Sequence, residues 1–120
     1  MLTGEETAES WHVENVMYLD INGDGAQEAL LLVRGDGDKR PLDWRLYAMK
    51  NGRLAQLFDR TRVAQGGLSV KGAALVESEG VYAAGDPDCC PSSAKRTYYV
   101  WKGDGLVVSR IEATPPGAAP

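Results

Sequence analysis

Short runs in which apolar and polar residues alternate follow one another along most of the chain, a pattern that predicts β-strands with one buried face. In the segment 43–49, for example, Trp44, Leu46 and Ala48 fall on one face and would point into a core. Residues 29–34 are almost continuously apolar, which is typical of a central strand. Together the pattern predicts strands over residues 11–19, 29–34, 43–49, 54–58, 68–71, 74–78, 95–102 and 106–112.

Glycine-rich turns separate these segments. The Asn51-Gly52 pair gives the strongest hairpin signal, because both residues tolerate the positive φ angles of a type I′ turn. Gly72 and the run 103–105 are expected to close two further hairpins. Sustained helical periodicity with a cap is absent, and residues 56–64 are expected to form at most a short turn. The predicted fold class is therefore mainly β with little helix, a single-domain antiparallel meander arranged as a curled sheet or a small sandwich.

Several groups of side chains have an expected placement. In the first strand we expect Trp11, Val13 and Val16 to point inward. The aromatic residues of the later strands fit cross-strand core packing, with a ligand-stacking face as the alternative. The basic residues are interspersed with acids, which favours solvated faces. The aromatic set is Trp44, Tyr47, Tyr98, Tyr99 and Trp101, and the basic set is Lys39, Arg40, Arg45, Arg53, Arg60 and Arg62.

Composition bounds the class of protein. The chain has 120 residues, of which 43% are hydrophobic and 25% charged, as in an ordinary globular domain. We expect a flexible N-terminal segment over residues 1–10, a single β domain over 11–113 and a disordered Pro/Ala-rich tail over 114–120. A net charge of −4 argues against nucleic acid or an anionic membrane surface as the main partner. The sequence has no apolar run of transmembrane length, and a monomer is expected.

An acidic loop follows the first predicted strand. Over residues 20–28, oxygen-bearing side chains recur at a spacing that could wrap them around one hard cation, with a backbone carbonyl as a further ligand. Gly25 permits the sharp turn that would direct them inward. Because neither His nor Cys lies nearby, the set favours Ca²⁺ over Zn²⁺ or copper. The candidate ligands are Asp20, Asn22, Asp24, the carbonyl of Ala26, and Glu28.

Two other interpretations of this loop bear on its function. An EF-hand requires a bidentate Glu at the twelfth position, where this chain has Leu31 within an apolar strand, so that motif does not fit. A hairpin turn that holds itself together by side-chain to backbone hydrogen bonds does fit, because Asp and Asn favour such turns. A weak structural calcium site and a self-bonded turn both stay open.

The two cysteines of the chain, Cys89 and Cys90, are adjacent. An intramolecular disulfide can therefore join only these neighbours, in a small ring that would rigidify the Pro-flanked turn between two strands. The alternatives are a reduced dithiol that binds a soft metal, a redox switch and an intermolecular bridge. Catalysis is not expected, because the single histidine, His12, is distant in sequence and Ser92 and Ser93 have no neighbouring base.

The order of these motifs resembles that in the LppP/LprE-type bacterial lipoproteins and related secreted proteins. The resemblance rests on the Asp-rich loop, on the segment 85–92 with its Asp-Cys-Cys-Pro-Ser core, and on the aromatic strand that follows and ends in Trp101. Asn is more frequent in that motif where this chain has Asp88. The Asp-rich loop by itself resembles the calcium-loop hairpins of FG-GAP and VCBS-type repeats.

The resemblance implies an exported cell-envelope β domain, periplasmic or lipid-anchored in the full-length gene product, and it supplies no catalytic residues. The chain itself begins without the basic and apolar regions of a signal peptide. We therefore expect a non-catalytic binding or structural domain that uses at most Ca²⁺ as a cofactor, with an envelope protein or a small ligand as its partner. The alternative function is that of a thiol redox or soft-metal protein acting through Cys89 and Cys90.

Overall fold

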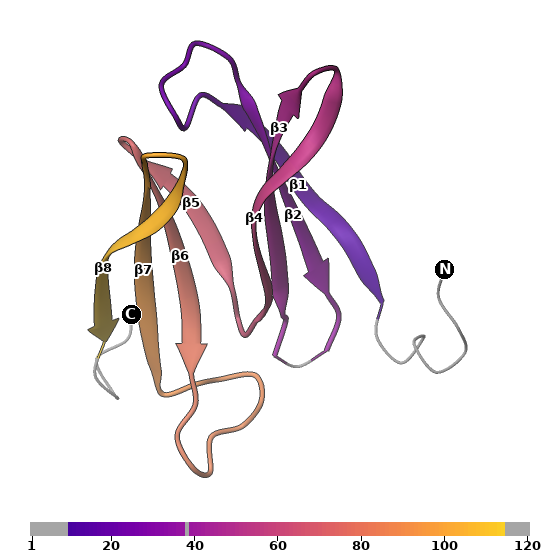
Figure 1. Cartoon of the computed structure of the whole chain (residues 1–120). Coiled ribbons are helices and arrows are strands. Elements are labelled where there is room, and N and C mark those ends of the chain that lie inside the picture. Colours follow the sequence, from indigo (N-terminus) through magenta and orange to yellow (C-terminus); the bar gives the residue numbers. More distant parts are fainter. Residues whose placement is uncertain (1–9, 38, 115–120) are drawn as a thin grey trace.

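The computed structural model describes residues 10–37 and 39–114, over which the chain forms strands and no helix (Figure 1). Within this described part there is accordingly no helix with the length and apolarity that a membrane crossing requires. The expected flexible N-terminal segment and Pro/Ala-rich tail fall almost entirely outside the described residues. The strands are β1 (Trp11–Leu19), β2 (Glu28–Gly35), β3 (Leu42–Lys50), β4 (Arg53–Val63), β5 (Gly67–Lys71), β6 (Ala74–Val81), β7 (Ser93–Lys102) and β8 (Gly105–Thr114).

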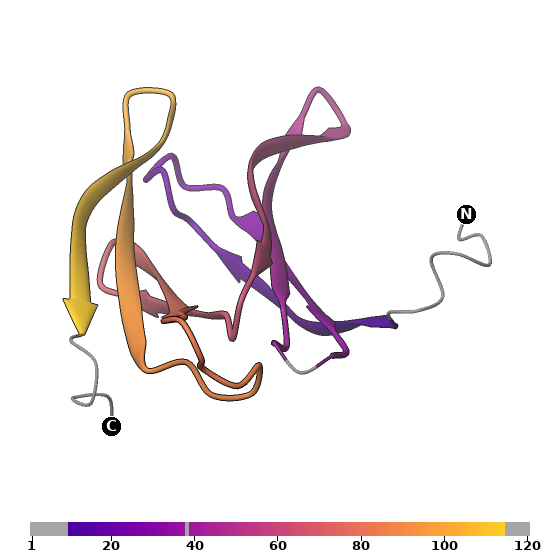
Figure 2. The same cartoon turned by 90° about the horizontal axis from the view of Figure 1, so that it is seen from below.

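The strands form two four-stranded antiparallel meanders, β1-β2-β3-β4 and β5-β6-β7-β8, in chain order. The inner faces of the two sheets pack together as a small sandwich, and the sheets diverge from each other when the molecule is seen from below (Figure 2). The predicted fold class is thereby confirmed. The Asn51-Gly52 hairpin is confirmed as well, since both residues have positive φ, 53° and 77°.

The core lies between the inner faces of the sheets. Trp44 on β3 is fully buried, and its ring centroid lies 5.3 Å from that of Phe58 on β4 and 5.5 Å from that of Tyr99 on β7. The predicted inward face of residues 43–49 is therefore correct, and core packing is the role of Trp44 and Tyr99. The buried core cluster comprises Ile21, Leu30, Leu32, Leu42, Trp44, Leu46, Val63, Leu75, Tyr99 and Leu106.

The expected inward face of β1 is wrong at two positions. Val13 and Val16 are 60% and 40% exposed, whereas Met17 packs against the core. Val13 pairs with Val33 and Val16 pairs with Leu31, both on the outer face of β2, whereas Met17 pairs with the buried Leu30. The register shift between Val13 and Asn15 moves the odd-numbered residues of β1 from the outer face to the inner face, so one simple alternation does not describe the whole strand. Because β1 is an edge strand, one irregular residue is accommodated there without disturbing a second neighbour.

The fourth strand is longer than predicted. In place of a short turn over residues 56–64, β4 continues to Val63, and its polar second half carries Arg60. The expectation that Arg60 lies on a solvated face is also wrong. Its guanidinium extends to the buried Glu77 on β6. The polar second half of β4 thus supplies a charged contact between the two sheets.

This contact is a bidentate ion pair supported by an indole. Glu77 is fully buried, and Arg60 donates from Nε to its Oε1 at 2.9 Å and from Nη2 to its Oε2 at 3.1 Å. The Trp44 indole N–H donates to the same Oε1 at 2.8 Å. The hydrogen bonds with Glu77 raise the pKa of Arg60 above its already high usual value. Burial, together with the charge of Glu77, raises the pKa of Tyr99.

We expect Glu77→Ala to lower the free energy of unfolding by about 3–5 kcal/mol, because it leaves the Trp44 N–H and the Arg60 guanidinium without their acceptor. Urea unfolding followed by tryptophan fluorescence measures the change. Glu79→Ala is the matched control: Glu79 lies 3.7 Å from Arg60 and 3.4 Å from Lys95 and is partly exposed, so its loss is expected to cost less than about 1 kcal/mol. Equal losses in the two variants would contradict a special role for Glu77.

Candidate metal loop and disulfide loop

The loop between β1 and β2 is organised by the carboxylate of Asp20. Its Oδ1 accepts hydrogen bonds from the backbone N–H groups of Gly23 at 2.9 Å and Asp24 at 3.2 Å, and its Oδ2 accepts one from Gly25 at 2.8 Å. Gly23 and Gly25 have φ of 76° and 88°, a region that favours glycine, and these angles let the backbone curl around the carboxylate. The self-bonded turn considered as an alternative is thus part of the structure.

Two further side chains of the loop bond in the same manner. The Oδ1 of Asn22 accepts from the N–H of Asp24 at 3.1 Å, and the Oδ1 of Asp24 accepts from the N–H of Ala26 at 2.9 Å. Each of these bonds uses one lone pair of an oxygen that has more than one, so the remaining acceptor capacity can still turn toward a cation. Self-bonding and metal binding are therefore compatible in this loop.

Glu28 differs from the other predicted ligands because it is buried. It is the first residue of β2 and is 2% exposed, and its Oε1 accepts a hydrogen bond from the N–H of Ile21 at 2.9 Å. Among the residues that the structure describes, Glu28 makes no ion pair. A buried carboxylate without a counter-charge is costly, and a bound cation removes that cost.

The structure brings the acidic candidates together. Ligand oxygens of Asp20, Asp24 and Glu28 all lie within 4.8 Å of one another, a separation that a single ion can bridge. Asn22 and Ala26 lie in the same loop, and with Asp24 and Glu28 they line a cavity of about 240 Å³. Met49, Leu57 and Trp101 also line this cavity. Hard oxygen donors in this arrangement suit a cation of the Ca²⁺ type.

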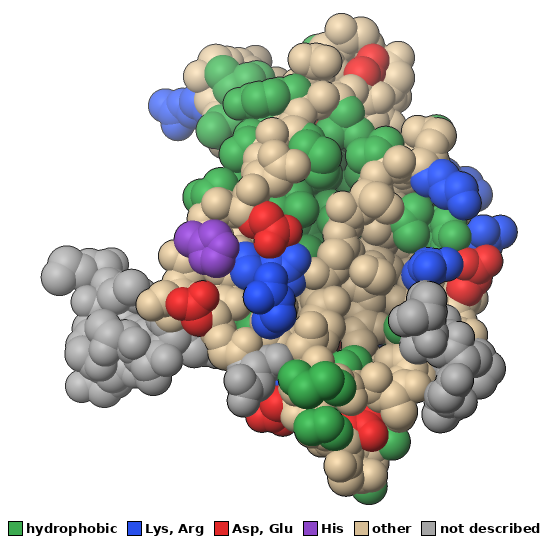
Figure 3. Space-filling view, turned by 180° about the vertical axis from the view of Figure 1, so that it is seen from behind, with side chains coloured by type: hydrophobic (Ala, Val, Ile, Leu, Met, Phe, Trp, Pro, Cys, Tyr) green, Lys and Arg blue, Asp and Glu red, His purple; other side chains and the backbone are tan. Residues whose placement is uncertain are grey.

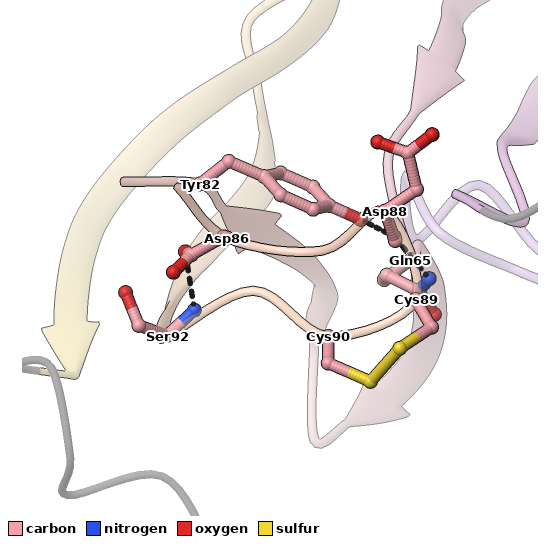
Figure 4. Close-up of a disulfide and its surroundings, with 7 residues drawn as sticks. All are labelled: Gln65, Tyr82, Asp86, Asp88, Cys89, Cys90 and Ser92. Atoms are coloured by element: carbon pink, nitrogen blue, oxygen red, sulfur yellow. Dashed lines mark hydrogen bonds between the residues drawn. A yellow bond between two sulfur atoms is a disulfide. The ribbon is translucent and has the colours of Figure 1, made fainter. Parts of the chain in front are cut away.

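The second motif forms a loop between β6 and β7. Cys89 and Cys90 are joined by a disulfide, with their Cα atoms 3.7 Å apart, so the predicted vicinal bond is confirmed (Figure 4). Both cysteines are exposed. The Cys90 N–H also donates to the carbonyl of Pro87 at 3.0 Å, which closes a tight turn around Asp88.

Asp86 holds the two ends of this loop together. Its Oδ2 accepts from the N–H of Ala83 at 2.7 Å. The same oxygen accepts from the N–H of Ser92 at 2.9 Å (Figure 4). These backbone donors favour the ionised form, so they lower the pKa of the Asp86 carboxyl below its usual value, the Ala83 bond contributing most. This role of Asp86 could not be predicted from the sequence, because a carboxylate in a turn has many possible acceptor roles.

Two residues that the sequence did not single out anchor the disulfide loop from outside the motif. The Tyr82 hydroxyl donates to the carbonyl of Asp88, and the Gln65 side-chain amide donates to the same oxygen at 3.4 Å (Figure 4). Gln65 belongs to the connection between the two sheets, between β4 and β5. A contact between positions so far apart in sequence has no local signature.

The two motifs lie at opposite ends of the sandwich. The acidic loop, at 20–27, is at the top of Figure 1 and the disulfide loop, at 82–92, is at the bottom. This separation follows from the antiparallel meander, in which successive connections alternate between the ends of the sheets. They therefore do not form one common site.

We expect the Asp86 carboxyl to titrate below the usual pH range of an aspartate, measured by carbon-detected NMR. Because its pKa is lowered in the folded state, its stabilisation of the loop is present at neutral pH and is lost as the pH falls through that lowered pKa. Accordingly, Asp86→Ala is expected to accelerate hydrogen exchange at the Ala83 and Ser92 amides at neutral pH. A carboxyl that titrates above the usual range, or unchanged exchange in the variant, would contradict this role.

The described residues thus form two separate candidate sites, an acidic loop at one end of the sheets and a disulfide loop at the other, and in each loop backbone N–H groups donate hydrogen bonds to an aspartate carboxylate. Comparison with protein-family models, with curated proteins and with solved structures gives no match to this chain.

Proposed function

We propose that this protein is a non-catalytic β domain that acts outside the cytoplasm, binds Ca²⁺ in the loop 20–28 and serves as a binding or structural module of the cell envelope. The observation that carries the calcium part is the burial of Glu28, whose carboxylate shares one cluster with those of Asp20 and Asp24. Three carboxylates so close repel one another, and a divalent cation turns that repulsion into attraction.

The donor set favours calcium among biological cations. Carboxylates of Asp20, Asp24 and Glu28 with the amide of Asn22 and the carbonyl of Ala26 offer five oxygen donors, and water completes the six to eight ligands that Ca²⁺ prefers. Mg²⁺ demands a more regular octahedron and gives up its water reluctantly. The affinity is expected to be weak, with a Kd of about 1 mM, because the loop is largely exposed and its carboxylates also bond to the backbone.

The role of such an ion would be structural. Ile21, the second residue of the loop, is a core residue, and Glu28 begins the central strand β2. A cation held between Asp20 and Glu28 would therefore stabilise two features together, the turn between β1 and β2 and the start of the buried strand β2.

The chemistry of the cysteines supports an extracytoplasmic location. Disulfides form and persist in oxidising compartments, and glutathione and thioredoxin keep most cytoplasmic cysteines reduced. The resemblance of the segment 85–92 to the LppP/LprE-type lipoproteins points the same way, toward an exported domain that is periplasmic or lipid-anchored. An envelope protein or a small ligand is the expected partner.

A second candidate function, a thiol redox or soft-metal protein, is favoured by the exposure of Cys89 and Cys90, which leaves their bond accessible to a reductant. Measuring the intact mass of the protein after thiol alkylation distinguishes the structural role of the disulfide from the redox or soft-metal function. The structural role predicts no alkylated cysteine in the protein as purified in air and two after strong reduction. Thiols that are already free, or a bond that the cytoplasmic glutathione poise reduces readily, would favour the redox function instead.

We expect Ca²⁺ to raise the melting temperature. For a Kd of about 1 mM, about 5 mM Ca²⁺ stabilises the folded state by about 1 kcal/mol, which corresponds to about 4 °C for a domain of this size. Calorimetry in EDTA and in Ca²⁺ measures the shift, with Mg²⁺ at the same concentration as the control ion. No shift with Ca²⁺, or the same shift with Mg²⁺, would overturn the proposed site.

Glu28→Gln tests whether the shift comes from this loop. The amide oxygen of Gln still accepts the Ile21 N–H and the buried charge is removed, so without Ca²⁺ the variant is expected to be at least as stable as the original protein. With Ca²⁺ it is expected to show no shift. Glu79→Gln, outside the loop, is the matched control and retains the shift. A Glu28→Gln variant that still responds to Ca²⁺ would place the ion elsewhere.

A further inference from the structure

A second cavity lies at the end of the sandwich opposite the acidic loop. Its volume is about 510 Å³, within the roughly 300–1,000 Å³ typical of small-molecule sites. Three segments meet around it: the β2–β3 connection, the end of β4 with the link to β5, and the disulfide loop. The described lining residues are Asp36, Gly37, Lys39, Pro41, Arg62, Ala64 and Asp88.

Hydrogen bonds between these segments hold the cavity in shape. The N–H of Gln65 donates to the carbonyl of Lys39 at 2.6 Å, its side chain donates to the carbonyl of Asp88, and the N–H of Gly80 donates to the carbonyl of Ala64 at 2.8 Å. Pro91 packs so closely on Gly80 that a Cβ there would lie 2.7 Å from the Pro91 Cγ. The walls are thus tied to both sheets.

Left-handed backbone conformations also concentrate around this cavity. Arg40, Arg62 and Gln65 have φ of 44°, 54° and 49°, although none is glycine or asparagine. Such residues are uncommon, and they persist where the surrounding structure holds them in place, often at binding sites. Among the residues that the structure describes, the fourth non-glycine residue with positive φ is Asn51, in the hairpin turn.

The lining contains charges of both signs. The ammonium of Lys39 lies 4.9 Å from the ring centroid of Tyr82, and the guanidinium of Arg62 lies 5.8 Å from that of Trp11, so an aromatic ring accompanies each cation. Asp36 and Asp88 supply the negative charges. The carboxylate of Asp88 points away from the disulfide (Figure 4), while its carbonyl is held by Tyr82 and Gln65.

The vicinal disulfide has a positioning role in this arrangement. Asp88 immediately precedes the ring formed by Cys89 and Cys90, and the Cys90 N–H bonds to Pro87 on its other side. The disulfide ring on one side and the turn hydrogen bond that spans Asp88 leave the Asp88 backbone few conformations, which reduces the entropy that a ligand would otherwise have to remove.

From these observations we infer that the cavity is a binding site for a small zwitterion, a free amino acid or short peptide whose carboxylate meets Lys39 and Arg62 and whose ammonium meets Asp36 and Asp88. A ligand with both charges matches a lining with both charges, whereas a simple anion or cation meets repulsion from half of it. This inference is independent of calcium binding, because the acidic loop is at the other end of the molecule (Figure 1).

Titration of the unaltered protein with L-alanyl-L-alanine, followed by amide NMR shifts and calorimetry, tests the site. We expect saturable binding with a Kd of about 1 mM or below, and among the described residues we expect the shifts to be confined to 36–37, 39–41, 62–65 and 82–92. N-acetyl-L-alanyl-L-alanine lacks the ammonium and L-alanyl-L-alaninamide lacks the carboxylate, and each is expected to bind at least about tenfold more weakly. Absence of binding, or full affinity for either single-charge form, would overturn the inference.

Variants locate the site. Asp88→Asn and Lys39→Met are each expected to weaken binding of L-alanyl-L-alanine by about three- to tenfold. Both residues are exposed, so the fold is expected to persist. Asp104→Asn and Lys102→Met, in the β7–β8 hairpin at the other end of the sheets, are the matched controls and are expected to bind as the unaltered protein does. Binding that is equal in all four variants would place the ligand outside this cavity.

Discussion

The arrangement of the two sheets depends on one buried carboxylate. Glu77 belongs to the second sheet, yet its hydrogen-bond donors, Trp44 and Arg60, belong to the first. Apolar packing between two twisted sheets tolerates small rotations and slides, whereas three directional bonds to one carboxylate do not. These bonds to Glu77 therefore restrain the angle between the sheets more tightly than the apolar contacts alone would.

Burial of a charge pair at this place has a cost that the surroundings offset. The guanidinium remains partly exposed while the carboxylate is fully buried, so only one partner loses all of its water. The indole N–H of Trp44 supplies a further donor to the buried oxygen, and the same indole packs against Phe58 and Tyr99. One residue thus joins the polar contact to the apolar core.

Alternation of apolar and polar residues, together with the turn chemistry of Asn51-Gly52, was sufficient to predict the strands and the meander, because both effects are local. The inner face of β1 could not be predicted, since the register shift near Asn15 depends on how β1 pairs with β2. The burial of Glu77 could not be predicted either, because the segment Glu77-Ser78-Glu79 has the composition of an exposed strand. Its partner Arg60 is supplied by another sheet, and such a contact has no signature in either segment alone.

The acidic loop and the mixed-charge cavity also differ in whether the sequence could predict them. The oxygen spacing of residues 20–28 identified the acidic loop in advance, because all of its members lie in one short segment. Adjacency likewise identified the disulfide. The mixed-charge cavity is assembled from three segments that only the packing of the sheets brings together, so its residues carried no shared pattern. Sequence patterns therefore revealed sites within a loop and missed the site between loops.

The chain-order pairing of both meanders has a kinetic consequence. Every strand pairs only with its neighbours in the sequence, so each sheet can form from hairpins whose loops are short, without a search for distant partners. Closing such loops takes little entropy, and the costly event is the docking of two nearly formed sheets, when Glu77 leaves water. Folding should therefore be fast for an all-β chain, with a barrier that falls late, at the joining of its two halves.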